Sequence, residues 1–141
     1  MSKDEVSARC SAIEECYEFF LAYAGQGLSG KEKSQACGQV REFLNSAVAA
    51  LSGLSETFAA AVKQENFQPA ERYLAFLTVL DRDASDSLAS INLVLAQPII
   101  SSQLVDNLNA SIHLRALLTD LFLIDEILKP QPLVAKPVVL D

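Results

Sequence analysis

Hydrophobic residues recur with a helical period along the whole chain, and no stretch alternates apolar and polar positions as a half-buried strand would. Proline first occurs at Pro69, so this period runs uninterrupted through the first half of the chain. The pattern therefore predicts an all-α protein. Its helices are expected at about residues 3–24, 39–64, 69–96 and 102–128.

The first predicted helix has a polar start, a glycine end and one apolar stripe. Ser2 and Glu5 have the spacing of a capping box, in which each side chain satisfies the other residue's free backbone N–H. Gly25 can take the left-handed conformation that ends a helix. Placing residues at 100° intervals puts one stripe over Val6, Cys10, Ile13, Tyr17, Phe20 and Ala24.

The second predicted helix repeats apolar residues at alternating spacings of four and three, the pattern of helices packed in a bundle. This series consists of Val40, Leu44, Ala47, Leu51, Leu54, Phe58 and Ala61. A helix from Lys31 to Gln64 would be about 50 Å long at 1.5 Å per residue, against about 33 Å for the first helix. We therefore expect a break near Gly38, with residues 31–37 forming a short separate turn.

Prolines and serines mark the ends of the last two helices. Pro69 suits a first helical turn, Pro98 stops that helix, and Ser101 or Ser102 caps the next one. Because the loops are only a few residues long, neighbouring helices should be antiparallel. The sequence thus predicts one domain over residues 1–129, an up-down-up-down antiparallel four-helix bundle, followed by an extended Pro-containing tail at residues 130–141.

Composition agrees with a single globular domain and narrows the choice of partners. Half of the 141 residues are hydrophobic and 21% are charged. The 18 acids outnumber the 11 bases and give a net charge of −7, which disfavours nucleic acids and anionic membranes as partners. The most apolar long stretch, residues 43–62, contains Asn45, Gly53 and Glu56 and keeps its apolar residues on one side, so we expect no membrane span.

Cysteine usage indicates a reducing compartment. Cys10, Cys16 and Cys37 form an odd set without C-x-x-C spacing, and the first ten residues, MSKDEVSARC, lack the apolar core of an export signal. We expect a cytoplasmic protein. The cysteines are interpreted as small buried residues, because no histidine is paired with them in the sequence to activate a thiol.

No motif in the chain predicts an enzyme. The stretch GQGLSGKE, residues 25–32, has the spacing of a phosphate-binding loop, but a predicted helix precedes it and Glu32 stands where Ser or Thr is needed. A paired-metal bundle site is disfavoured as well, because the chain has one histidine and no Glu-x-x-His motif. We therefore predict no catalytic residues, no cofactor and no metal site.

Four polar residues remain candidates for a functional role. His113 could accept a phosphoryl group on a helix, and its position on the helical wheel lies in a polar stripe with Asp120. Asp125 projects into the apolar arc of its helix, and Arg9 into that of the first helix. A buried charge needs a partner, so we expect Arg9 and Asp125 to form an ion pair that fixes helix register; a ligand-binding charge is the alternative.

The stretch IHLRALLTDLFLIDEIL, residues 112–128, is apolar on two sides of its helix. A broad arc of Leu114, Leu117, Leu118, Leu121, Phe122, Ile124 and Leu128 is expected to face the core. A second arc consists of Ile112, Ala116, Leu123 and Ile127. A four-helix bundle needs one such arc, and monomers rarely expose the other, so we expect it to pair with a second copy rather than with the tail.

The function predicted from these features is protein–protein interaction. The chain is expected to be a small cytoplasmic helical adaptor, regulator or assembly factor that forms a homodimer and binds a further, unidentified protein. A chaperone that shields a partner's amphipathic helix belongs to the same class. The alternative from another class is a phosphorelay or small-ligand-binding bundle that uses His113 or Asp125.

Overall fold

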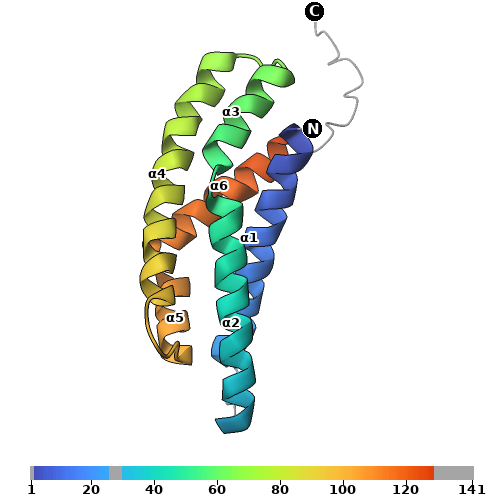
Figure 1. Cartoon of the computed structure of the whole chain (residues 1–141). Coiled ribbons are helices and arrows are strands. Elements are labelled where there is room, and N and C mark those ends of the chain that lie inside the picture. The colour runs from blue at the N-terminus through green and yellow to red at the C-terminus, as the bar shows by residue number, and fades with distance from the viewer. Residues whose placement is uncertain (1, 26–29, 129–141) are drawn as a thin grey trace, which may run out of the picture.

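The computed structural model describes the backbone of residues 2–25 and 30–128, and the side chains of residues 3–22 and 39–128. Every element in these ranges is a helix, as predicted, and no strand occurs in them. The helices are α1 (Ser2–Gly25), α2 (Gly30–Leu51), α3 (Leu54–Gln64), α4 (Ala70–Leu95), α5 (Ser102–Ala110) and α6 (Ile112–Leu128) (Figure 1).

The second predicted helix is broken, though not where we expected. α2 runs without interruption from Gly30 to Leu51, so the predicted break near Gly38 is wrong. The chain breaks instead at Gly53, which has a φ of 82°, in the left-handed region that glycine adopts at little cost. α3 then starts at Leu54, and its first turn is closed by the Thr57 N–H, which donates to the Gly53 carbonyl at 2.9 Å.

The fourth predicted helix is also divided, at Ser111. The backbone of this residue leaves the helical region, with φ −59° and ψ 132°. Its Oγ accepts a hydrogen bond from the backbone N–H of His113 at 3.2 Å, as a helix N-cap does. Ser111 is therefore both the residue at which α5 ends and the N-cap of α6.

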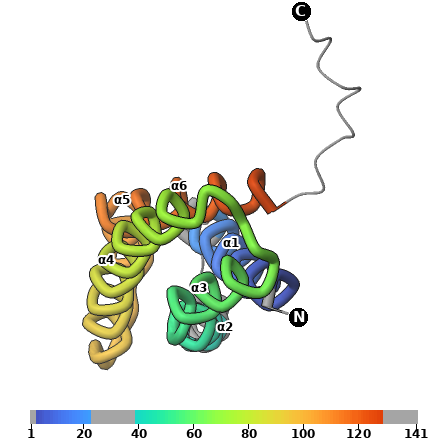
Figure 2. Tube along the Cα trace, turned by 90° about the horizontal axis from the view of Figure 1, so that it is seen from above, coloured from blue at the N-terminus to red at the C-terminus, as the bar shows by residue number. Residues whose placement is uncertain are grey.

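The described part of the chain forms six helices where we predicted four, so the up-down-up-down four-helix arrangement is not confirmed. α1 and α2 lie side by side, and α3 continues beyond the end of α2 (Figure 1). α6 runs obliquely across the other helices, from the α5 end towards the start of α1 (Figures 1 and 2). The predicted tail at residues 130–141 and the loop residues 26–29 lie outside the described residues.

One core joins helices from both halves of the chain. All seven members of the apolar series from Val40 to Ala61 are buried, on both sides of the break at Gly53. Phe19 of α1 stacks on Phe43 of α2 with ring centroids 4.2 Å apart.

None of the helices in the described part of the chain is long and apolar enough to cross a membrane.

Two arginines satisfy backbone carbonyls where neighbouring helices end. Arg9 of α1 donates through Nη1 to the carbonyls of Ala49, Ala50 and Ser52 at 2.6–3.1 Å, at the C-terminus of α2. Arg41 of α2 does the same for α4, where it donates to the carbonyls of Leu95, Gln97 and Pro98. The last carbonyls of a helix have no partner within it, and they carry partial negative charge, so a guanidinium is well suited to them.

Candidate functional site on helix α6

The second apolar arc of α6 lies on the protein surface. Ile112, Leu123 and Ile127 are 75%, 50% and 47% exposed, and Ala116 beside them is half-buried. We call these four residues the outer strip. On the other side of the helix, six members of the predicted core arc are buried: Leu114, Leu117, Leu118, Leu121, Ile124 and Leu128. The predicted division of α6 into a buried and an exposed apolar side is thus correct.

Phe122 is the exception, because it was predicted to face the core and is exposed. On the helical wheel it lies beyond Leu118, at the edge of the buried arc. A helix on the outside of a packed structure is covered over about half of its circumference, and Phe122 falls at that limit. The apolar surface of α6 is therefore larger than the sequence indicated.

The side of α6 between the outer strip and the buried arc faces α4. It carries two polar residues, His113 and Asp120, which differ in their exposure to solvent. His113 is half-exposed, and its Nδ1 lies 3.8 Å from Oδ2 of Asp86 on α4. Asp120, which we placed with His113 in a polar stripe, is instead buried. Ser87 of α4, also buried, donates through Oγ to the main-chain carbonyl of His113 at 2.9 Å.

Asp120 faces a second carboxyl group, that of Asp83 on α4. Burial raises the pKa of Asp120 to about 7, and a side-chain hydrogen bond to Asp83 and the negative charge of Asp83 act in the same direction. A hydrogen bond between two carboxyl groups requires a proton on one of them. Near neutral pH, the raised pKa therefore keeps a substantial share of the Asp120 carboxyl groups protonated where α6 meets α4.

The predicted ion pair between Arg9 and Asp125 is wrong. Arg9 is held at the C-terminus of α2 by three carbonyls, and it forms no ion pair with Asp125 in the described part of the chain. Asp125 is half-buried and lies close enough to Cys10 of α1 to help raise the pKa of that thiol. The sequence does not show which helix ends beside Arg9, so it gives no sign that backbone carbonyls are the partners of this guanidinium.

The cysteines whose side chains are described are buried, as predicted. Burial, with a smaller effect of Asp125 and then Glu14, raises the pKa of the Cys10 thiol to about 12. Burial also raises the pKa of Cys16 to about 11, with Glu15 adding to the effect, and its Sγ donates to the Phe43 carbonyl at 3.0 Å. Both remain thiols at neutral pH, and a thiol is a poor nucleophile. The side chain of Cys37 lies outside the described residues.

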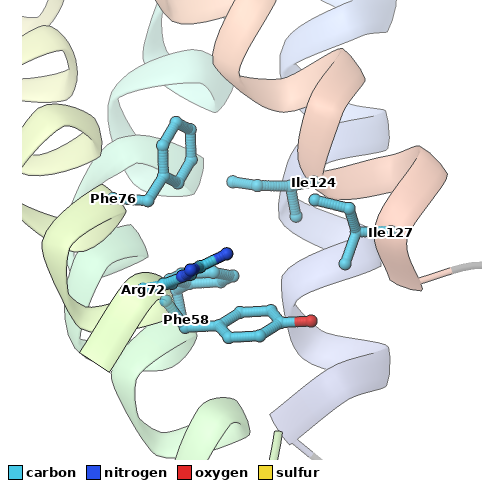
Figure 3. Close-up of a pocket in the computed structure, with 6 residues that line it drawn as sticks. Phe58, Arg72, Phe76, Ile124 and Ile127 are labelled. Atoms are coloured by element: carbon cyan, nitrogen blue, oxygen red, sulfur yellow. The ribbon is translucent and has the colours of Figure 1, made fainter. Parts of the chain in front are cut away.

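An apolar pocket of about 230 Å³ lies between α3, α4 and the last turns of α6 (Figure 3). It is lined by Phe58, Arg72, Tyr73, Phe76, Ile124 and Ile127. Ile127 also belongs to the outer strip, so the pocket and the strip adjoin. Neither His113 nor Asp125 lines this pocket, and we did not identify it from the sequence.

The residues that the sequence analysis missed belong mainly to α4. Asp83 and Asp86 are three positions apart, a spacing that places them on one side of a helix, and this was the available signal. Arg72 and Phe76 are four positions apart and likewise share a side. What the sequence did not show is that this side of α4 lies against α6.

Comparison of the chain with protein-family models, with curated proteins and with solved structures gave no match in any of the three.

Proposed function

We propose that the chain acts through protein–protein contact, with the outer strip of α6 pairing with the same strip of a second copy. The observation that supports this is the exposure of Ile112, Leu123 and Ile127 along one side of a single helix. The strip extends over about 22 Å at 1.5 Å per residue. A strip of one helix is self-complementary about a two-fold axis, so two copies bury it without any other partner.

Further support comes from what surrounds the strip. Arg115 and Glu126, which carry opposite charges, border the strip on the side away from α4. Protein interfaces commonly have such a polar rim around an apolar centre. As a homodimer the chain would serve as an adaptor, regulator or assembly factor that also binds a further protein.

The cytoplasm is the proposed setting. Cys10 and Cys16 are free thiols, and disulfides are rare in that compartment.

The test is the oligomeric state of a variant with Leu123→Glu and Ile127→Glu, measured by light scattering over a range of concentrations. The control carries Leu21→Glu and Leu74→Glu, which add the same charge at residues that are 51% and 48% exposed on α1 and α4. We expect the wild type and the control to dimerise and the strip variant to be monomeric. A wild type that is monomeric at high micromolar concentration would rule out the homodimer.

A phosphorelay role is the second candidate, and the geometry of His113 supports it. The imidazole is half-exposed, and Asp86 approaches its Nδ1, which leaves Nε2 as the nitrogen available to a phosphoryl donor. Formation of a stable phosphohistidine at His113 by a histidine kinase is the corresponding test. A chain that stays unphosphorylated with every kinase of its own cell removes this candidate.

A further inference from the structure

The pocket between α3, α4 and α6 combines an apolar interior with one positive charge. Of the six described residues that line it, five are aromatic or aliphatic: Phe58, Tyr73, Phe76, Ile124 and Ile127. The sixth is Arg72, which is exposed and extends from the first turn of α4 towards the space between the two isoleucines and the phenylalanines (Figure 3). Most of the pocket is thus suited to a hydrocarbon group, and its polar end to an anion.

Contacts with their neighbours hold the aromatic walls in place. Phe58 of α3 meets Phe76 of α4 edge to face, with ring centroids 6.4 Å apart. Tyr73 is stacked on Phe67, which precedes α4, with centroids 5.2 Å apart. Aromatic pairs in these geometries are favourable beyond their buried area, so the pocket walls are already ordered before anything binds.

Arg72 differs from the arginines that cap helices. Arg9 and Arg41 donate to backbone carbonyls, whereas the guanidinium of Arg72 has no hydrogen-bond or ion-pair partner among the residues that the structure describes. A guanidinium binds a carboxylate through two parallel hydrogen bonds. Among the described residues that line the pocket, Arg72 is the only charged one. An anion in the pocket therefore has a positive partner in Arg72, although the chain as a whole carries a net charge of −7.

We propose that this pocket binds a small amphipathic carboxylate, whose hydrocarbon body lies among the aromatic and isoleucine side chains and whose carboxylate pairs with Arg72. The volume limits the size of the body. A cavity of about 150 Å³ suffices for benzene, so a pocket of about 230 Å³ accepts a chain or ring system of roughly eight carbons. Octanoate is the probe with these properties.

The experiment titrates the full-length chain with octanoate, followed by NMR of the methyl groups of Ile124 and Ile127. Octylammonium and 1-octanol supply the same body with a positive or neutral head, and acetate supplies the head without the body. We expect octanoate to bind at least about tenfold more tightly than octylammonium or octanol, because a charge-assisted hydrogen bond contributes on this scale. Acetate should not shift either isoleucine.

Two variants separate the role of Arg72 from general hydrophobic binding. Arg72→Gln should weaken octanoate about tenfold and leave octanol unchanged. Arg82→Gln is the matched control, because Arg82 is exposed on the same helix, does not line the pocket and lies about 80° away from Arg72 on the helical wheel. It should alter neither affinity. Equal binding of octanoate and octanol, an Arg72→Gln variant with wild-type affinity, or the absence of shifts at Ile124 and Ile127 would overturn the proposal.

Discussion

Asp120 of α6 and Asp83 of α4 face each other, carboxyl to carboxyl, where the two helices meet. The pKa of Asp120 is raised from 3.8 to about 7. Between these two values the folded chain holds a proton that the unfolded chain has released, so its stability falls as the pH rises from about 4 to about 7. The pair therefore favours the folded state in mildly acidic solution.

This pH dependence is testable with Asp120→Asn, whose amide stays neutral and can donate to Asp83. We expect the variant to gain stability relative to the wild type as the pH is raised from 5 to 8, measured by urea unfolding at each pH. Asp106→Asn is the control, because Asp106 is exposed on α5. A difference between Asp120→Asn and wild type that does not change with pH would show that Asp120 is ionised throughout.

Arg9 should stabilise the folded chain through its hydrogen bonds to the carbonyls at the C-terminus of α2. Arg9→Met removes the donor to three carbonyls, and we expect a loss of about 2 kcal/mol in the free energy of unfolding, since hydrogen bonds from charged groups contribute about 1.5–3 kcal/mol. Combining it with Asp125→Asn should give additive losses, because the two residues have separate partners. A coupling energy above about 1 kcal/mol in that double-mutant cycle would restore the ion pair that we first predicted.

Cys10 and Cys16 should be protected from thiol reagents in the folded chain. With pKa values of about 12 and 11, both are protonated at pH 8, and both are buried. The measurement uses a Cys37→Ser variant, in which Cys10 and Cys16 are the remaining thiols. Under native conditions we expect an aromatic disulfide reagent to label them no faster than the chain unfolds. In denaturant both thiols should react at once. Labelling within seconds under native conditions would contradict this assignment.

His113 should matter little for folding. Its contact with Asp86 is half-exposed and 3.8 Å long, and such surface pairs contribute between 0 and about 1 kcal/mol. We expect His113→Ala to change the free energy of unfolding by less than about 0.5 kcal/mol. Ser87→Ala, which removes the hydrogen bond to the His113 carbonyl from a buried site, should cost about 1 kcal/mol and serves as the comparison. A loss of more than 1 kcal/mol in His113→Ala would assign the imidazole a structural role.

Much of the core could be predicted from the sequence, because burial follows the helical period even where the helix breaks. Leu51 and Leu54 are both buried on either side of Gly53. They are three positions apart, and the left-handed glycine between them changes the backbone while both side chains remain on the core side. The apolar series was therefore right, although the continuous helix that it implied was not.

The positions of the two breaks were harder to predict. Gly53 is a recognisable helix terminator, but its neighbours in the sequence continue the apolar series, a pattern that an uninterrupted helix fits equally well. Ser111 is a good N-cap residue, yet it lies in the sequence N-A-S-I-H with no acidic residue three positions later to signal a helix start.

The candidate site was predictable as far as it depends on one helix. The exposure of Ile112, Leu123 and Ile127 follows from the helical wheel of α6 alone. The raised pKa of Asp120 depends in part on Asp83, which is 37 residues earlier in the chain, and the pocket depends on three separate helices. Such relations arise from tertiary packing, and the pattern of a single segment does not contain them.

The hydrogen bonds that Arg9 and Arg41 form inside the structure bear on how the proposed association of two copies should respond to salt. Both guanidinium groups are held by backbone carbonyls of their own chain, so neither is free to form a salt bridge with an acid of a second copy. Two approaching copies, each with a net charge of −7, repel one another in dilute buffer. Added salt shortens the range of that repulsion from about 30 Å at 0.01 M to about 8 Å at 0.15 M, and it should leave the proposed apolar contact between outer strips in place. Self-association of this protein should therefore strengthen as salt is added.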